Sequence, residues 1–139
     1  TFESIGTFSH IHEWTMTGLG IFPTQGKLQT TVGDQNDPES GYRSRMDKNS
    51  EKAGIGLYKV NLTDTKITAE LSATTRASFQ KYTFHKAKKG RVMIDLTIPS
   101  EYAYEVLDAE IKKISDYRIE GFSHQLSPNT WAGGIDQEY

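Results

Sequence analysis

The sequence predicts an antiparallel all-β protein, a β-sandwich, and three observations support this prediction. Apolar and polar residues alternate with period two, most clearly from Ile67 to Ala73 and from Val92 to Ile98, which is typical of strands buried on one face. Polar turn segments separate these stretches at short intervals, as they do in a meander. Ser100 to Asp108 is the one segment compatible with a helix, and it fits an alternating strand pattern equally well.

The expected strands, in chain order, are Leu19 to Phe22, Tyr58 to Leu62, Ile67 to Ala73, Phe79 to Phe84, Val92 to Ile98, Glu110 to Ser115 and Arg118 to Gln125. Pro23 is expected to end the first of them, because proline cannot donate to a sheet. Phe79, Tyr82 and Phe84 fall out of strict alternation, which predicts a bulge within one strand or a change of frame. Turns are expected at Gly54 to Gly56, Asp64-Thr65, Lys86 to Gly90 and Asp116-Tyr117, and a polar loop is expected from Asp34 to Gly41.

Composition restricts the function further. The chain has 139 residues, the length of one domain, and a formal net charge of -2. This near-neutral charge argues against nucleic acid and anionic membranes as partners, while a neutral ligand such as a sugar remains compatible. No apolar run is long enough to insert into a membrane as a spanning helix. The absence of cysteine excludes disulfides, thiolate metal sites and a cysteine nucleophile.

The densest polar and aromatic cluster is Ser9 to Trp14, which contains His10, His12, Glu13 and Trp14. These residue types suit a sugar ring, since Trp stacks on its apolar face while His and Glu bond its hydroxyls. Two histidines spaced by two would also share one face of a strand and could hold a divalent metal, with His85 or His124 as a third ligand. A polar loop satisfied by backbone and water is the remaining alternative.

A second cluster spans Tyr42 to Glu51 and alternates in charge. Its simpler interpretation is a solvated loop whose ion pairs contribute little to stability. Its functional interpretation has Arg43 or Arg45 oriented by Asp47 or Glu51 and directed into a site.

The motifs of the whole chain, taken in order, are Phe8 to Trp14, Gly18 to Thr24, Gly41 to Lys48, Glu51 to Ala53, Gly56 to Val60, Ala69 to Arg76, Arg91 to Leu96 and Ile119 to Ser123. In this order and spacing they resemble glycoside hydrolases of family 92, which are bacterial exo-acting α-mannosidases. The resemblance implies an N-terminal β-sandwich, part of a supersandwich domain, followed by a larger helical barrel. It also implies calcium, a mannose-containing glycan as substrate, and hydrolysis with inversion by one acid and one base.

The resemblance places the acid, the base and most calcium ligands in the helical barrel, so we expect no catalytic residue in this chain. Residues 1–139 are expected to be a single truncated sandwich domain, because the chain begins at Thr1 and a strand is expected to start at Ile135, just before the sequence stops. The resemblance further implies a periplasmic or extracellular location. The candidate substrate-binding residues are His10, His12, Glu13, Trp14, Arg43, Arg45 and Asp47.

Two alternatives compete with this hypothesis. A self-standing carbohydrate-binding module without catalytic activity would use Trp14, Trp131 and several tyrosines as an aromatic platform. A small metal-dependent enzyme would use His10 and His12. If the missing helical domain is the natural partner, an apolar face rich in aromatics should be exposed here and could cause self-association.

Overall fold

A computed structural model describes residues 4–10, 19–86, 89–96, 105–126 and 136–138. The described secondary structure is antiparallel β throughout, apart from one turn of 3-10 helix, so the all-β prediction is confirmed. The elements are β1 (Ser4–Ile5), β2 (Gly20–Thr24), η1 (Pro38–Ser40), β3 (Ser44–Gly54), β4 (Leu57–Leu62), β5 (Ile67–Ala73), β6 (Ser78–Phe84), β7 (Arg91–Asp95), β8 (Glu105–Ser115), β9 (Arg118–Leu126) and β10 (Asp136–Glu138). Within those ranges no helix is both long and apolar enough to cross a membrane.

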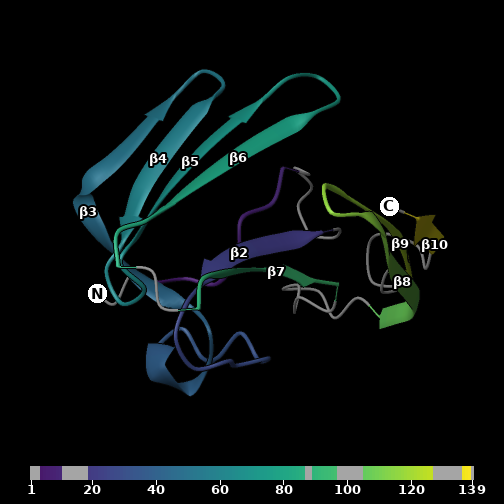
Figure 1. Ribbon diagram of the computed structural model, residues 1–139, viewed down its shortest axis with the longest axis horizontal. Helices are drawn as coiled ribbons and strands as arrows, with labels where there is room; N and C mark the ends of the chain where they lie inside the picture. Colours follow the sequence, from purple (N-terminus) through teal and green to yellow (C-terminus); the bar gives the residue numbers. More distant parts are fainter. Residues whose placement is uncertain (1–3, 11–18, 87–88, 97–104, 127–135, 139) are drawn as a thin grey trace. The chain divides into compact units, whose positions relative to one another are not determined.

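The chain divides into two compact units. The first combines Thr1–His10 with Ile21–Met93, and the second combines Ile11–Gly20 with Ile94–Tyr139. The first unit contains a five-stranded antiparallel sheet in the order β1-β3-β4-β5-β6, whose long strands lie side by side in Figure 1. Strands β2 and β7 form a separate two-stranded sheet. The candidate residues that the structure describes all belong to the first unit.

The core of the first unit lies on one face of the five-stranded sheet. Cross-strand partners share a face, and the register pairs Val60 with Ala69 and Leu62 with Ile67. These four side chains are at most 1% exposed. Phe22 of β2 belongs to the same core cluster, so β2 covers this face as the second layer of a sandwich.

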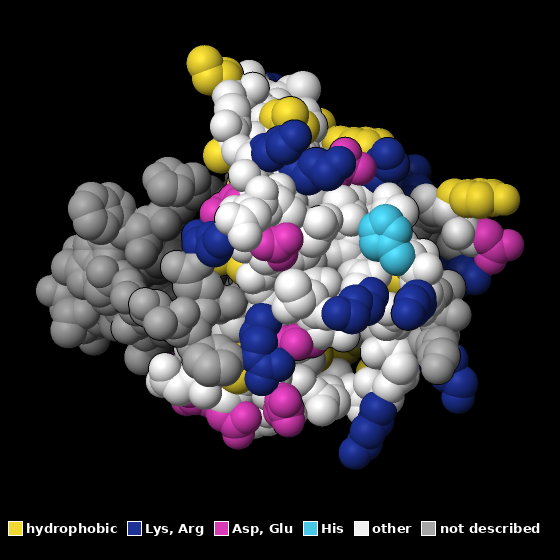
Figure 2. All heavy atoms as spheres, turned by 90° about the vertical axis from the view of Figure 1, so that its left-hand side faces the viewer, with side chains coloured by type: hydrophobic (Ala, Val, Ile, Leu, Met, Phe, Trp, Pro, Cys, Tyr) yellow, Lys and Arg dark blue, Asp and Glu magenta, His cyan; other side chains and the backbone are white. Residues whose placement is uncertain are grey.

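The opposite face of the same sheet is polar. Lys59, Glu70 and Lys81 lie opposite one another on β4, β5 and β6, and both lysines form ion pairs with Glu70, at 3.2 and 3.3 Å. Figure 2 shows lysine, arginine and acidic side chains interspersed on one face of the molecule. This face of the sheet therefore carries charges of both signs.

The second unit contains the three-stranded sheet β10-β9-β8. The hairpin of β8 and β9 turns at Asp116 and Tyr117, as predicted, and β10 begins at Asp136, inside the stretch expected to start a strand. Large apolar side chains are exposed along this hairpin, among them Ile111 at 43% and Ile119 at 52%. Self-association through such a surface stays a prediction. Of the undecided segment, the part from Glu105 is strand β8, and residues 100–104 lie outside the described residues.

Strand β3 corrects the most consequential sequence expectation. The Tyr42 to Glu51 cluster was expected to be a loop, yet Ser44–Gly54 forms an eleven-residue strand. Its register with β4 shifts between Asp47 and Lys52, where Ser50 Oγ donates to the Asp47 carbonyl at 2.6 Å. Backbone pairing with β4 holds the strand on both sides of this register shift. Neither the pairing nor the shift produces an alternation of apolar residues in the sequence.

Two smaller expectations were also wrong. Strand β6 has no bulge, because all seven of its residues pair in one continuous register with β5; Phe79 is simply an exposed aromatic on the outer face, at 67%. Strand β2 continues through Pro23 to Thr24. The backbone N–H of Ile21 donates to the Phe8 carbonyl in an isolated bridge. The backbone nitrogen of Pro23 is on the same side of β2 but beyond this bridge, so no hydrogen-bond donor is needed there.

Candidate functional site

Arg43 precedes β3 and braces the first unit internally. Its Nε donates to Ser4 Oγ at 2.9 Å, and one terminal nitrogen donates to the Gly33 carbonyl at 3.0 Å. The other terminal nitrogen donates to the Ser4 carbonyl at 3.4 Å. The guanidinium therefore ties β1 and the Gly33 loop to the start of β3, which is a structural use of its fixed fork of donors.

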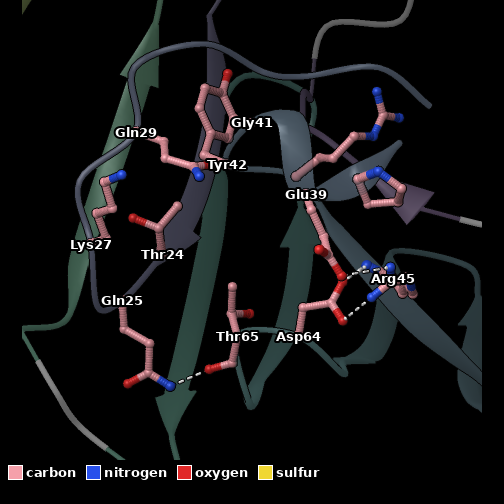
Figure 3. A pocket seen from close by; sticks show the side chains of 12 residues that line it. Thr24, Gln25, Lys27, Gln29, Glu39, Gly41, Tyr42, Arg45, Asp64 and Thr65 are labelled. Atoms are coloured by element: carbon pink, nitrogen blue, oxygen red, sulfur yellow. Dashed lines mark hydrogen bonds and ion pairs between the residues drawn. The ribbon is translucent and has the colours of Figure 1, made fainter. Parts of the chain in front are cut away.

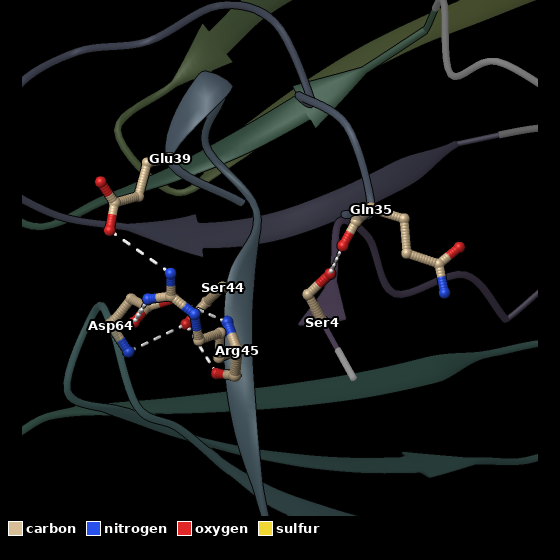
Figure 4. Close-up of polar contacts among 6 residues, drawn as sticks. All are labelled: Ser4, Gln35, Glu39, Ser44, Arg45 and Asp64. Atoms are coloured by element: carbon tan, nitrogen blue, oxygen red, sulfur yellow. Dashed lines mark hydrogen bonds and ion pairs between the residues drawn. The ribbon is translucent and has the colours of Figure 1, made fainter. Parts of the chain in front are cut away.

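Arg45 lies in a polar pocket of about 300 Å³. Its guanidinium forms an ion pair with Asp64 at 2.8 Å and another with Glu39 at 3.3 Å, and its backbone N–H donates to Asp64 at 2.8 Å (Figures 3 and 4). These two carboxylates, first Asp64 and then Glu39, raise the pKa of the Arg45 guanidinium. Asp64 and Glu39, rather than the expected Asp47 or Glu51, thus orient Arg45.

Asp47 lines a different pocket of about 300 Å³, together with Lys66, Thr68 and His85. Its carboxylate accepts a hydrogen bond from the Asn49 backbone at 3.0 Å, which is a local turn interaction within the irregular part of β3. Asp47 is therefore used to shape β3, and its side chain is not directed at Arg43 or Arg45.

His10 borders a third pocket, also of about 300 Å³. Leu57, Tyr58 and Leu71 form much of the apolar lining of this pocket. The Nδ1 atom of His10 lies 2.9 Å from Nε2 of Gln80 on β6. An apolar wall beside an oriented imidazole provides both a stacking surface and a polar contact, which is the combination a sugar ring requires.

Tyr58 connects this pocket to the charged part of β3. Its hydroxyl donates to Glu51 Oε1 at 2.7 Å, and Lys48 pairs with the other oxygen of Glu51 at 2.9 Å. Burial first, and the Glu51 carboxylate second, raise the pKa of Tyr58 well above its ordinary value. Lys48 and Tyr58 in turn lower the pKa of the Glu51 carboxyl. Tyr58 therefore stays protonated and Glu51 stays ionised, which keeps this hydrogen bond in place at neutral pH.

The structure thus distributes the described candidates over three pockets instead of one. His10 borders one pocket, Arg43 and Arg45 a second, and Asp47 a third. His12, Glu13 and Trp14 lie outside the described residues, as does Trp131. Tyr58, which lines the His10 pocket, and Gln80, which contacts His10, were not among the candidates. For Gln80, the signal in the sequence was a polar residue at a position of β6 that faces the core side of the sheet. The exposed aromatic Phe79 beside it broke the apolar alternation and hid this signal.

The calcium that the family resemblance implies stays a prediction for this chain. Among the described residues there is no group of three or more His, Asp or Glu side chains arranged to hold a metal ion. The two-histidine alternative stays untested, because His12 lies outside the described residues; His10 Nδ1 lies 2.9 Å from Gln80 Nε2.

The fold and its pockets define an antiparallel β-sandwich domain. The family model of the glycosyl hydrolase family 92 N-terminal domain matches residues 1–137, and the chain belongs to this family. Its fold is similar to that of a family GH92 α-mannosidase from Bacteroides thetaiotaomicron, with a TM-score of 0.74 and 24% identity over 80% of this chain. A structure of that enzyme in complex with mannoimidazole gives the same TM-score of 0.74 and the same 24% identity, again over 80% of this chain.

The chain spans only 15% and 14% of the length of these two structures. The comparison with curated proteins finds no match.

Proposed function

We propose that this chain is the β-sandwich part of an exo-acting α-mannosidase and that it contributes the pocket beside His10 to the binding of a terminal mannose. The observation that carries the proposal is the placement of His10, the first histidine of the Ser9 to Trp14 motif, against Tyr58, Leu57 and Leu71. Membership of glycosyl hydrolase family 92 supplies the reaction class.

The catalytic carboxylates of this proposed enzyme belong to a C-terminal helical domain. One acid protonates the leaving oxygen and one base activates water, with inversion at the anomeric carbon. We place most of the calcium ligands in the same helical domain, as the family resemblance implies. The contribution of the sandwich is to bind and orient the sugar.

The exposed apolar face of the β8–β9 hairpin is proposed to contact the helical domain. Ile111 and Ile119 share one face of this hairpin, since they neighbour each other diagonally across the register, and about half of each side chain is exposed. Aliphatic side chains at such positions gain stability when a partner covers them. An extracytoplasmic location for the enzyme is part of the same proposal.

The test compares the 139-residue chain with a polypeptide that also contains the helical domain. Hydrolysis of α-mannobiose is expected only from the longer polypeptide, and calorimetry with the isolated chain should show very weak binding or none. If the helical domain alone hydrolysed α-mannobiose as well as the longer polypeptide does, the proposal would be contradicted. The alternative, a self-standing binding module, predicts clear saturable binding of mannosides by the isolated chain.

A further inference from the structure

We propose that Gln80 and Tyr82 are positioning residues for His10. Together they determine which ring nitrogen of His10 carries the proton, and so make its imidazole a hydrogen-bond donor at Nε2, the nitrogen remote from Gln80. The use of this donor on a mannoside rests on the proposed function, whereas the protonation pattern of His10 does not.

The three side chains form one hydrogen-bonded chain. Gln80 and Tyr82 are two residues apart on β6, so both point to the same face of the sheet. The Tyr82 hydroxyl donates to Gln80 Oε1, and Gln80 Nε2 lies 2.9 Å from His10 Nδ1. Gln80 is thereby held at both ends of its carboxamide.

The polarity of this chain follows from the chemistry of each group. A carboxamide accepts at its oxygen and donates at its nitrogen, so a hydroxyl donor at Oε1 leaves the amino end for His10. An amino donor requires a lone pair on His10 Nδ1. In a neutral imidazole with an unprotonated Nδ1, the proton lies on Nε2.

Tyr82 keeps the proton that it donates to Gln80. Its ring stacks with that of Phe8, with centroids 6.4 Å apart and planes inclined by 30°. Burial raises the pKa of the Tyr82 hydroxyl above its ordinary value, so the hydroxyl keeps its proton. The ring cannot turn away without losing the contact with Phe8, and the hydroxyl retains a proton for its hydrogen bond to Gln80 Oε1.

The same four residues also connect two segments that are far apart in the sequence. Phe8 contacts Tyr82. His10, which follows Phe8 by two residues, contacts Gln80, which precedes Tyr82 by two residues on β6. The short segment from Phe8 to His10 is thus attached to β6 at both ends. An imidazole held in this way presents a donor, and a ligand oxygen bound at Nε2 has to accept, which leaves the proton of a sugar hydroxyl for another partner.

The test is nitrogen-15 NMR of histidine-labelled protein at neutral pH, which distinguishes a protonated ring nitrogen from an unprotonated one. The chain has four histidines, and His10→Gln assigns the signal of interest. In the wild type we expect the proton on Nε2 of His10. In Gln80→Glu we expect it on Nδ1, because a carboxylate only accepts. In Tyr82→Phe, which retains the ring contact with Phe8, the preference for Nε2 should fall about tenfold, as expected for the loss of one hydrogen bond.

His85 is the internal control. Its Nε2 lies 2.7 Å from Thr68 Oγ1, and its signal should be the same in the wild type and in the three variants if the fold is intact. A wild-type His10 protonated on Nδ1, or a Gln80→Glu protein with an unchanged His10 pattern, would overturn the proposal. These spectra need no sugar, so absence of mannosidase activity in the longer polypeptide would refute the proposed function and leave this result intact.

Discussion

Phe8→Ala is expected to destabilise the first unit by about 3–5 kcal/mol, the usual cost of removing a buried phenylalanine ring. Phe8 is 7% exposed. Its ring centroid lies 5.6 Å from that of Phe22 and 6.4 Å from those of Tyr58 and Tyr82. The ring therefore joins β2, β4 and β6, and its removal leaves a cavity that rigid sheets close only in part.

The assay is urea unfolding followed by circular dichroism, with Phe79→Ala as the matched control. The Phe79 ring is 67% exposed on the outer face of β6, so its removal should cost less than about 1 kcal/mol. With a urea slope of about 2 kcal/mol per molar, Phe8→Ala should lower the midpoint by roughly 2 M. Phe8→Leu keeps a large apolar side chain and should be affected much less. Equal costs for Phe8→Ala and Phe79→Ala would refute this account of the core.

Two further predictions concern charge and backbone conformation. Lys59 and Lys81 lower the pKa of the Glu70 carboxyl below its ordinary value of 4.5. A carboxyl whose pKa falls on folding stabilises the folded state at pH values above its pKa in the unfolded chain, and this stabilisation is lost as the pH falls through its pKa in the folded chain. Glu70→Gln should thus destabilise the chain at about pH 7 and have no effect at about pH 2, and an equal effect at both would contradict this explanation. Gly33 and Gly26 have φ of +82° and +83°, but a Cβ on Gly33 would meet backbone nitrogen at 2.5 Å while one on Gly26 meets nothing within 4 Å. Denaturant unfolding should therefore show a cost of roughly 1–2 kcal/mol for Gly26→Ala and clearly more for Gly33→Ala; equal costs would show that the crowding at Gly33 is unimportant.

Strands with a buried apolar face were predictable from the sequence. Ile67, Ala69 and Leu71 alternate with polar residues, and β5 has the predicted bounds because these three side chains enter the core. Strand β3 could not be predicted in this way. Apart from Ser44, none of its side chains is fully buried, and it is held by backbone pairing to β4, which leaves no periodic signal in the sequence.

The candidate site was predictable only in its parts. His10 was recognised as a candidate from its residue type and its neighbours, and the structure places it beside a pocket. The partners of Arg45 were not predictable, because Asp64 and Glu39 reach it from a turn and a 3-10 helix whose positions depend on the tertiary fold. Proximity in sequence suggested Asp47 and Glu51 instead. Along strand β3 these two side chains lie elsewhere, with Asp47 at another pocket and Glu51 bound to Tyr58 and Lys48.

The most direct test of the account is the kcat/KM for α-mannobiose of His10→Ala in the polypeptide that contains the helical domain, beside Arg45→Gln as the comparison. We predict that His10→Ala lowers kcat/KM at least about tenfold, as expected for the loss of one contact to the sugar in the transition state. Arg45→Gln, whose side chain is engaged by Asp64 and Glu39, should change kcat/KM by less than about threefold. An unchanged kcat/KM in His10→Ala, with a large decrease in Arg45→Gln, would contradict the assignment of the sugar-binding pocket to His10.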